Sequence, residues 1–192
     1  THRGSSAASD VYKRQVNLFS ITNNINVIPN FIDIEKYSKV KRNPYRSKLC
    51  PKVERLLIHT SNFRKVKRIQ DVINVFCKIN KEIPSKLIMI GDGPERANIE
   101  SLTRSLCSLR DVMFIGKIPD VETVLYKADL FLLTSEKESF GLSALEAMAS
   151  SVPVISSNAG GLPELVEEGI SGFTCDIGCL LYTSPSPRDT AL

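Results

Sequence analysis

Five apolar segments of strand length constrain the fold of this chain more than any other feature of its sequence. They are residues 53–60, 86–91, 111–116, 129–135 and 152–157. Their residues are nearly all apolar and do not alternate with polar ones. Continuous apolar runs are typical of strands that helices cover on both faces of a parallel sheet. The five segments therefore predict the strands of a buried parallel sheet.

Amphipathic segments with helical spacing separate these runs. Apolar residues in segment 68–83 recur every three or four positions and form one stripe along a helix. They are Ile69, Val72, Ile73, Phe76, Ile79 and Ile83. Weaker patterns predict helices in segments 95–107, 121–128 and 140–150. Alternating strands and helices predict an α/β fold, a doubly wound parallel sheet with right-handed crossovers.

The two ends of the chain differ in composition from its middle. Residues 1–15 and 179–192 are rich in Ser, Thr, Pro and Arg and lack helical or strand periodicity. They resemble translated sequencing-adaptor sequence, and natural disordered tails are the alternative. Residues 16–52 contain an extended run and a basic loop broken by prolines, which predicts an interdomain segment. Residues 53–178 form the predicted domain.

Charge, hydropathy and cysteine content argue against several classes of protein. The formal net charge of +4, part of which lies in tail 1–15, is too small to indicate nucleic-acid binding. Without an apolar run of roughly 18 residues or a charged-then-apolar start, we expect neither a membrane span nor a signal segment. The five cysteines favour reduced thiols and a cytoplasmic location. Cys175 and Cys179 lack a second ligand pair, so we expect no zinc site.

Ligands of open α/β sheets bind beyond the carboxyl ends of the strands, and the loop after the first strand is strongly basic there. Arg64, Lys65, Lys67 and Arg68 precede the first helix. Cations at a helix N-terminus are unfavourable by about 0.3–1 kcal/mol each. A bound anion such as a diphosphate would remove this penalty. A solvated basic turn explains the loop equally well.

The loop after the second strand, GDGPER (91–96), begins like a dinucleotide-binding motif. Arg96 stands where the motif G-x-G-x-x-G has its third glycine, which argues against a Rossmann dinucleotide site. We expect Gly91 and Gly93 to allow a tight turn into the next helix.

The segment after the fourth strand carries two glutamates, Glu138 and Glu146, with seven residues between them. Residues 140–142 begin a helix whose first amides are free, and Gly141 lets a ligand approach the backbone. Helical spacing places Leu142, Leu145 and Ala149 on the sheet side, and Ser143, Glu146 and Ser150 on another face. Both carboxylates suit the vicinal hydroxyls of a sugar or ribose. Two surface glutamates are the alternative, which the spacing alone slightly favours.

Taken together, these motifs resemble glycosyltransferase family 4, the retaining GT-B enzymes that use nucleotide-sugar donors. The resemblance runs from about residue 27 to 174. It rests on VIPNFID (27–33), Lys67, the pair Glu138 and Glu146, and GGLPELVEEGISGF (160–173). Asn62 replaces an arginine that is usual in the family, and Arg64 is the replacement that we expect. The resemblance implies the Rossmann-like C-terminal half of a GT-B glycosyltransferase.

The resemblance also implies roles for residues of this chain. Glu138 would bind the hydroxyls of the donor sugar, and Glu146 the ribose. Lys67, Arg64 and the backbone amides of Ser139, Phe140, Gly141 and Leu142 would hold the diphosphate, with Asn62 nearby. Lys117 and Ile118 would face the base. Transfer would proceed on one face of the sugar without a protein nucleophile, cofactor or metal.

Within the family, SNFRKVKRIQDVINVF (61–76), PNFID and GDGPER resemble a branch that acts in bacillithiol biosynthesis. This implies transfer of N-acetylglucosamine from UDP to L-malate by a parent enzyme that may form a homo-oligomer. The acceptor-binding half is absent from this sequence, so we expect weak binding of the UDP-sugar and no transfer by this chain alone. Alternatives are a family member with a lipid or polysaccharide acceptor and a non-catalytic nucleotide-binding module. A GT-B epimerase is disfavoured because it would not need the two glutamates.

Overall fold

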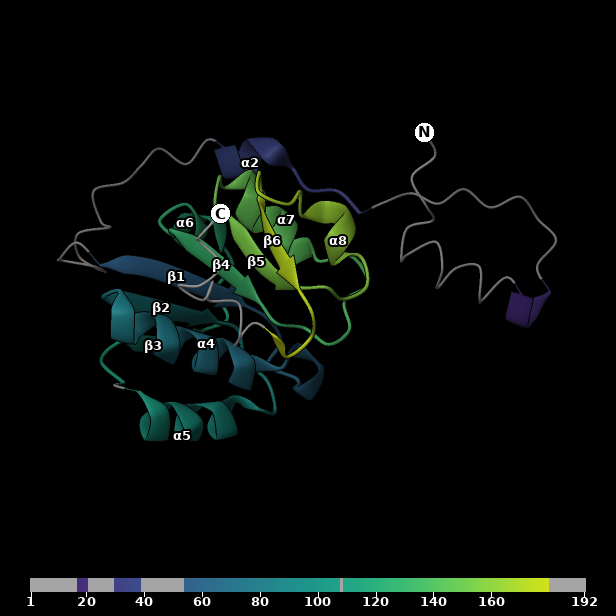
Figure 1. Ribbon diagram of the computed structural model, residues 1–192. Helices are drawn as coiled ribbons and strands as arrows, with labels where there is room; N and C mark the ends of the chain where they lie inside the picture. The colour runs from purple at the N-terminus through teal and green to yellow at the C-terminus, as the bar shows by residue number, and fades with distance from the viewer. Residues whose placement is uncertain (1–16, 21–29, 39–53, 108, 180–192) are drawn as a thin grey trace, which may run out of the picture.

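The computed structural model describes residues 17–20, 30–38, 54–107 and 109–179. Its centre is a six-stranded parallel sheet with strand order β3-β2-β1-β4-β5-β6 (Figure 1). The strands are β1 (Arg55–Thr60), β2 (Ser85–Ile90), β3 (Val112–Gly116), β4 (Leu130–Leu133), β5 (Val154–Ser157) and β6 (Gly172–Cys175). The predicted doubly wound parallel sheet is confirmed, and five strands lie where the apolar runs predict them.

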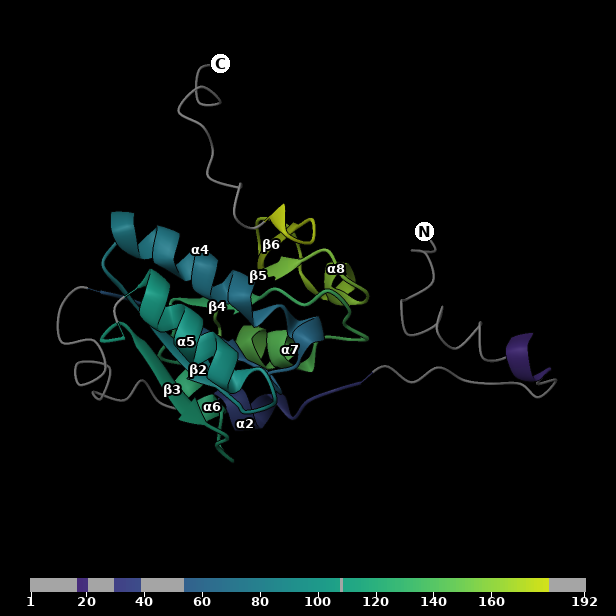
Figure 2. The same ribbon diagram turned by 90° about the horizontal axis from the view of Figure 1, so that it is seen from below.

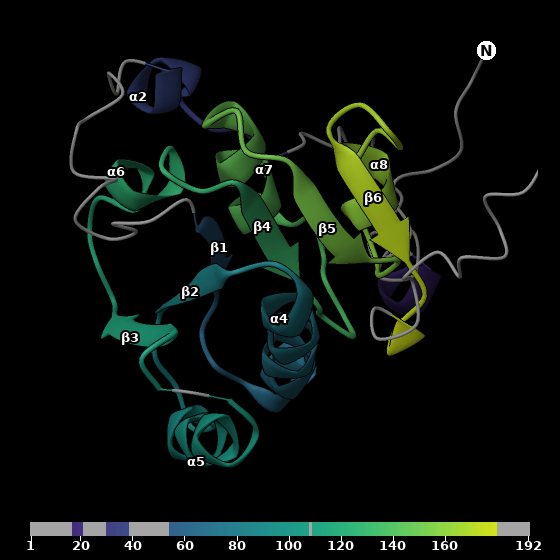
Figure 3. The ribbon, with the colours of Figure 1, turned by 60° about the vertical axis from the view of Figure 1, so that its left-hand side comes forward.

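Helices cover both faces of this sheet (Figure 2, Figure 3). On one face lie α4 (Ile69–Glu82) and α5 (Arg96–Leu106). On the other lie α2 (Ile34–Ser38), α6 (Glu122–Leu125), α7 (Leu142–Ala149) and α8 (Leu162–Leu165). The four helices predicted between the strands are confirmed, with α6 shorter than expected. The short helices α2 and α8 and the strand β6 were not predicted.

The strands are apolar on both sides because each side packs against a helical layer. On β1, Leu56 and Ile58 belong to the cluster under α7, whereas Leu57 belongs to the cluster under α4. On β4, Phe131 and Leu132 divide between the clusters in the same way. Alternate side chains of a strand point to opposite faces, so two covered faces require an unbroken apolar run.

The prediction for the sheet-facing side of α7 was wrong. Ala144 and Ala147 are fully buried, whereas 43% of Leu142 is exposed. The helix is therefore rotated by about two residues from the predicted phase. Small side chains bring α7 close to the sheet, and a leucine in that position would hold it away.

The prediction of reduced cysteines was also wrong for one pair. Cys77 in α4 and Cys107 directly after α5 form a disulfide, with their Cα atoms 5.9 Å apart. The two helices lie side by side on the same face of the sheet, which brings together cysteines that are distant in sequence (Figure 1). Cys175 and Cys179 are free.

Most of the predicted tails 1–15 and 179–192, and most of segment 16–52, lie outside the described residues. Within the part of the chain that the structure describes, the helices are too short or too polar to cross a membrane.

Candidate functional site

The connections between strands change direction between β1 and β4. The chain runs outward from β1 to β2 and β3, then returns to β4 on the other side of β1 and continues to β5 and β6. Such a switch point leaves a crevice at the carboxyl edge of the sheet, where ligands of open α/β proteins bind. Loops 61–68 and 134–141 flank this edge. Both contain residues that the sequence predicts to bind a donor.

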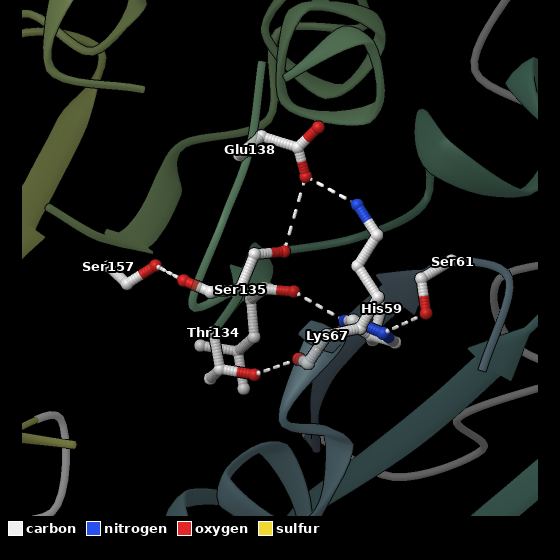
Figure 4. A network of polar contacts seen from close by, with 8 residues as sticks. His59, Ser61, Lys67, Thr134, Ser135, Glu138 and Ser157 are labelled. Carbon is white, nitrogen blue, oxygen red and sulfur yellow. Dashed lines mark hydrogen bonds and ion pairs between the residues drawn. The ribbon is translucent and has the colours of Figure 1, made fainter. Parts of the chain in front are cut away.

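Lys67 and Glu138, one from each loop, lie against each other at this edge (Figure 4). Lys67 Nζ donates a hydrogen bond of 2.5 Å to Glu138 Oε2, and the Ser135 hydroxyl donates one of 3.2 Å to the same oxygen. The Ser157 hydroxyl of β5 donates to the Ser135 carbonyl. The side chains of Lys67 and Glu138 are 18% and 15% exposed. The ammonium and the carboxylate therefore neutralise each other where water screens them weakly.

Main-chain contacts fix the two loops relative to each other. The Thr134 hydroxyl lies 3.0 Å from the carbonyl oxygens of both Lys67 and Arg68 and donates to them. The backbone amide of Glu136 donates to the Val66 carbonyl at 2.8 Å. The backbone of Lys67 is thus attached to the end of β4, which keeps its side chain beside loop 134–141.

His59, near the end of β1, is a buried polar residue under this loop that the sequence did not single out. Its Nδ1 lies 2.8 Å from the Leu132 carbonyl and its Nε2 2.8 Å from the Ser61 hydroxyl. Burial, with a smaller contribution from the nearby Lys67, lowers the pKa of His59 to about 4. A neutral ring beside a carbonyl must donate from Nδ1, so Nε2 accepts the proton of the Ser61 hydroxyl. His59 thereby links the cores of β1 and β4.

The Gly160–Gly161 turn supports the loop that carries Glu138. A Cβ on Gly160 would lie 1.7 Å from the Glu138 carbonyl oxygen, and one on Gly161 would lie 2.8 Å from that of Ser139. The Gly161 amide donates a hydrogen bond of 3.1 Å to the Glu138 carbonyl. The glycines thus allow two backbone segments to touch, which holds Glu138 in place.

Gly91 and Gly93 have the structural role that the sequence predicts. A Cβ on Gly91 would lie 1.8 Å from the Ser61 carbonyl oxygen, and one on Gly93 would lie 2.5 Å from that of Asn62. The two glycines therefore let the loop after β2 pack directly against the loop after β1.

Carboxylates of the protein already pair with part of the basic cluster. Arg68 Nε donates to Asp71 at 2.7 Å, in addition to the ion pair of Lys67 described above. Arg64 and Lys65 are exposed. The electrostatic argument for a bound anion is therefore weaker than the sequence suggests, because two of the four cations have partners within the chain.

Glu146 lies in a different environment from Glu138. It is half-buried on α7 and accepts a hydrogen bond from the Tyr37 hydroxyl of α2. Burial raises the pKa of Glu146, Tyr37 and Lys36 lower it, and the neighbouring Glu122 raises it. The contacts of Glu146 within the described residues thus come from α2 and α6. The structure does not bring it into contact with Glu138.

The family of the chain follows from comparison with known proteins. The model of the family "Glycosyl transferases group 1" matches residues 41–178. The chain belongs to this family. It is 45% identical over 155 residues to N-acetyl-alpha-D-glucosaminyl L-malate synthase of Bacillus anthracis, covering 80% of this chain and 41% of that protein. It is 34% identical over 155 residues to alpha-monoglucosyldiacylglycerol synthase of Streptococcus pneumoniae, covering 76% and 35%. The chain thus spans less than half the length of these relatives.

Structural comparison agrees with this assignment. Anabaena HepE, in a crystal structure with UDP and glucose, superposes with a TM-score of 0.72 and 28% identity, covering 81% of this chain and 44% of that one. The described sheet is the Rossmann-like C-terminal half of the GT-B glycosyltransferase fold.

The other predicted site residues lie around the same edge. Gly141 precedes α7 with a φ of +92°, which glycine adopts readily. Ser139 and Leu142 are exposed and Phe140 is partly buried beside it, so the start of α7 is accessible. Ile118, after β3, packs partly against the core under α7.

His59 and Tyr37 are the two residues of this region that sequence reasoning missed. A histidine inside an apolar strand was a possible signal for the first. We find no signal in the sequence that would have identified the second.

Proposed function

We propose that this sheet binds the nucleotide-sugar donor of a retaining glycosyltransferase at the carboxyl edge between β1 and β4. The observation that carries the proposal is the meeting of Lys67 and Glu138 at the switch point, 2.5 Å apart. An ammonium for a diphosphate and a carboxylate for sugar hydroxyls are thereby placed next to each other. The similarity to HepE, whose structure contains UDP and glucose, supports a nucleotide sugar as the ligand.

In this proposal each residue has a separate task. Lys67 leaves Glu138 and binds the diphosphate, with help from Arg64 and the first amides of α7. Glu138 accepts hydrogen bonds from the sugar hydroxyls, and Glu146 from the ribose. The residues that line the donor around them are Asn62, Ser139, Phe140, Gly141, Leu142 and Ile118.

The chemistry requires stabilisation of a leaving diphosphate. The bond from the anomeric carbon to the phosphate oxygen breaks, and the acceptor hydroxyl forms a bond to that carbon on the same face. Its proton passes to the departing phosphate oxygen. Lys67 and the helix amides stabilise the charge that develops there. We propose that no metal and no protein nucleophile takes part.

The donor and acceptor follow from the relatives. We propose UDP-N-acetylglucosamine and L-malate, and hence a cytoplasmic role in bacillithiol biosynthesis, because the N-acetyl-alpha-D-glucosaminyl L-malate synthase is 45% identical. A lipid acceptor is the second candidate, which the 34% identity to a glucosyldiacylglycerol synthase favours. Product formation with L-malate or with a diacylglycerol acceptor, assayed in a protein with both halves of the GT-B fold, separates the two.

The donor site itself is tested by isothermal titration of the chain with UDP and with UDP-N-acetylglucosamine. We expect Lys67→Met to weaken binding of both ligands about 10- to 100-fold, the loss of a charge-assisted hydrogen bond. Lys65→Met is the matched control, because Lys65 is exposed on the same short helix. Equal effects of the two substitutions would refute the site.

A second substitution distinguishes a sugar-binding site from a plain nucleotide-binding module. Glu138→Gln should weaken UDP-N-acetylglucosamine more than UDP, because only the former offers sugar hydroxyls to the carboxylate. A non-catalytic nucleotide module would bind the two ligands alike and lose both equally.

A further inference from the structure

Helix α2 brings a buried tyrosine to the predicted ribose-binding residue. Tyr37 is 7% exposed and belongs to the core cluster that includes Ala144 and Ala147 of α7. A tyrosine hydroxyl that leaves water needs a hydrogen-bond partner. The partner of Tyr37 is the carboxylate of Glu146, which lies on the same helix as the two alanines.

Charged groups of α2 and α6 complete the surroundings of Glu146. Lys36 Nζ lies 3.3 Å from Glu122 Oε2, and both groups act on Glu146. Tyr37 and Lys36 favour the ionised form of Glu146, whereas burial and the negative charge of Glu122 oppose it. The carboxylate is therefore held between a hydroxyl and an ammonium on one side and a second carboxylate on another.

We propose that Tyr37 is a positioning residue whose hydroxyl orients the Glu146 carboxylate for the ribose hydroxyls of the donor. This inference rests on the proposed function, because it assigns Glu146 to the ribose. A carboxylate can accept about four hydrogen bonds. Tyr37 occupies one of these positions, and the remaining ones are available to the 2′ and 3′ hydroxyls. The buried phenol ring cannot swing away, so Glu146 presents these positions in a fixed direction.

The test uses Tyr37→Phe, which keeps the ring and its packing and removes the hydroxyl alone. We expect its UDP affinity to fall by about tenfold, the typical loss of one hydrogen bond to a charged group. Tyr126→Phe, at the end of α6, is the matched control and should leave the affinity unchanged. The loss should shrink for 2′-deoxy-UDP, which offers one ribose hydroxyl fewer. A purely structural effect of the substitution would weaken both nucleotides equally.

The pH dependence of UDP binding provides the second readout. If the ionised carboxylate binds ribose, affinity falls as the pH drops through the pKa of Glu146. Because Tyr37 and Lys36 hold this pKa down, Tyr37→Phe and Lys36→Met should move the fall to higher pH. Glu122→Gln removes a group that raises the pKa and should move the fall to lower pH. The diphosphate titrates identically in each case, so the differences between variants report on Glu146.

The outcomes separate this inference from the proposed function. If Glu146→Gln leaves UDP affinity unchanged, the ribose assignment itself fails. If Glu146→Gln weakens binding while Tyr37→Phe changes neither affinity nor pH dependence, the donor site stands and the role of Tyr37 is refuted.

Discussion

The contact between Gly160 and the backbone of Glu138 leads to a quantitative prediction for Gly160→Ala. The new Cβ would lie 1.7 Å from the Glu138 carbonyl oxygen, against about 3.4 Å in an ordinary contact. The carbonyl must therefore retreat by about 1.7 Å. It would then lose the hydrogen bond from the Gly161 amide, which measures 3.1 Å.

The expected cost is the sum of two effects. Alanine at the φ of +56° of Gly160 costs about 1–2 kcal/mol by itself. A lost hydrogen bond that leaves a buried amide unsatisfied adds about 1–3 kcal/mol. We therefore expect Gly160→Ala to lower the free energy of unfolding by about 2–5 kcal/mol, measured by urea denaturation.

Gly169→Ala is the matched control. Gly169 has a φ of +74°, but nothing lies within 4 Å of its Cβ position. It should therefore lose the backbone contribution of about 1–2 kcal/mol and no more. Because the displaced carbonyl belongs to Glu138, Gly160→Ala should also weaken UDP-N-acetylglucosamine, whereas Gly169→Ala should not. Equal stability and equal affinity in the two variants would show that the close approach is not a constraint.

Three further measurements test other features. The pKa of His59 falls from 6.5 to about 4 on folding, so the unfolded chain binds its proton first. Stability should decline by about 3 kcal/mol as the pH falls from 6.5 to 4, and urea titrations of His59→Gln should lack this decline. Reduction of the Cys77–Cys107 disulfide, which spans 30 residues, should lower the free energy of unfolding by about 3–4 kcal/mol. If dithiothreitol changes the stability of the wild type no more than that of Cys77→Ser, the bond is absent in solution. EDTA should leave the UDP affinity of the chain unchanged, whereas a loss restored by Mg²⁺ would overturn the metal-free mechanism.

The sequence predicts the sheet well because burial on two faces leaves a clear pattern. Leu56, Leu57 and Ile58 had to be apolar together, since consecutive side chains enter opposite layers. The edge strand β6 lacks this pattern: Gly172 has no side chain and 55% of Phe173 is exposed. Its glycine is explained by the structure alone, because a Cβ there would lie 1.8 Å from the Val154 carbonyl oxygen.

The candidate site was predictable where position along a strand determines position in space. Lys67 and Glu138 both follow strands, and the parallel sheet brings such loops to one edge. Partnerships between distant residues left no comparable signal. His59 binds the carbonyl of Leu132, 73 residues away, and Tyr37 reaches its partner because α2 packs over α7. The disulfide was missed for the same reason, since it depends on how α4 and α5 pack.

The ion pair between Lys67 and Glu138 has a consequence for product release in the proposed reaction. A donor with its sugar engages both groups, the ammonium by phosphate and the carboxylate by hydroxyls. After transfer, UDP still holds Lys67, but Glu138 has lost its hydroxyl donors and faces an anion. Re-formation of the ion pair satisfies Glu138 and competes directly with the bound diphosphate. The protein thus carries its own competitor for the product, and UDP should dissociate faster from the wild type than from Glu138→Gln.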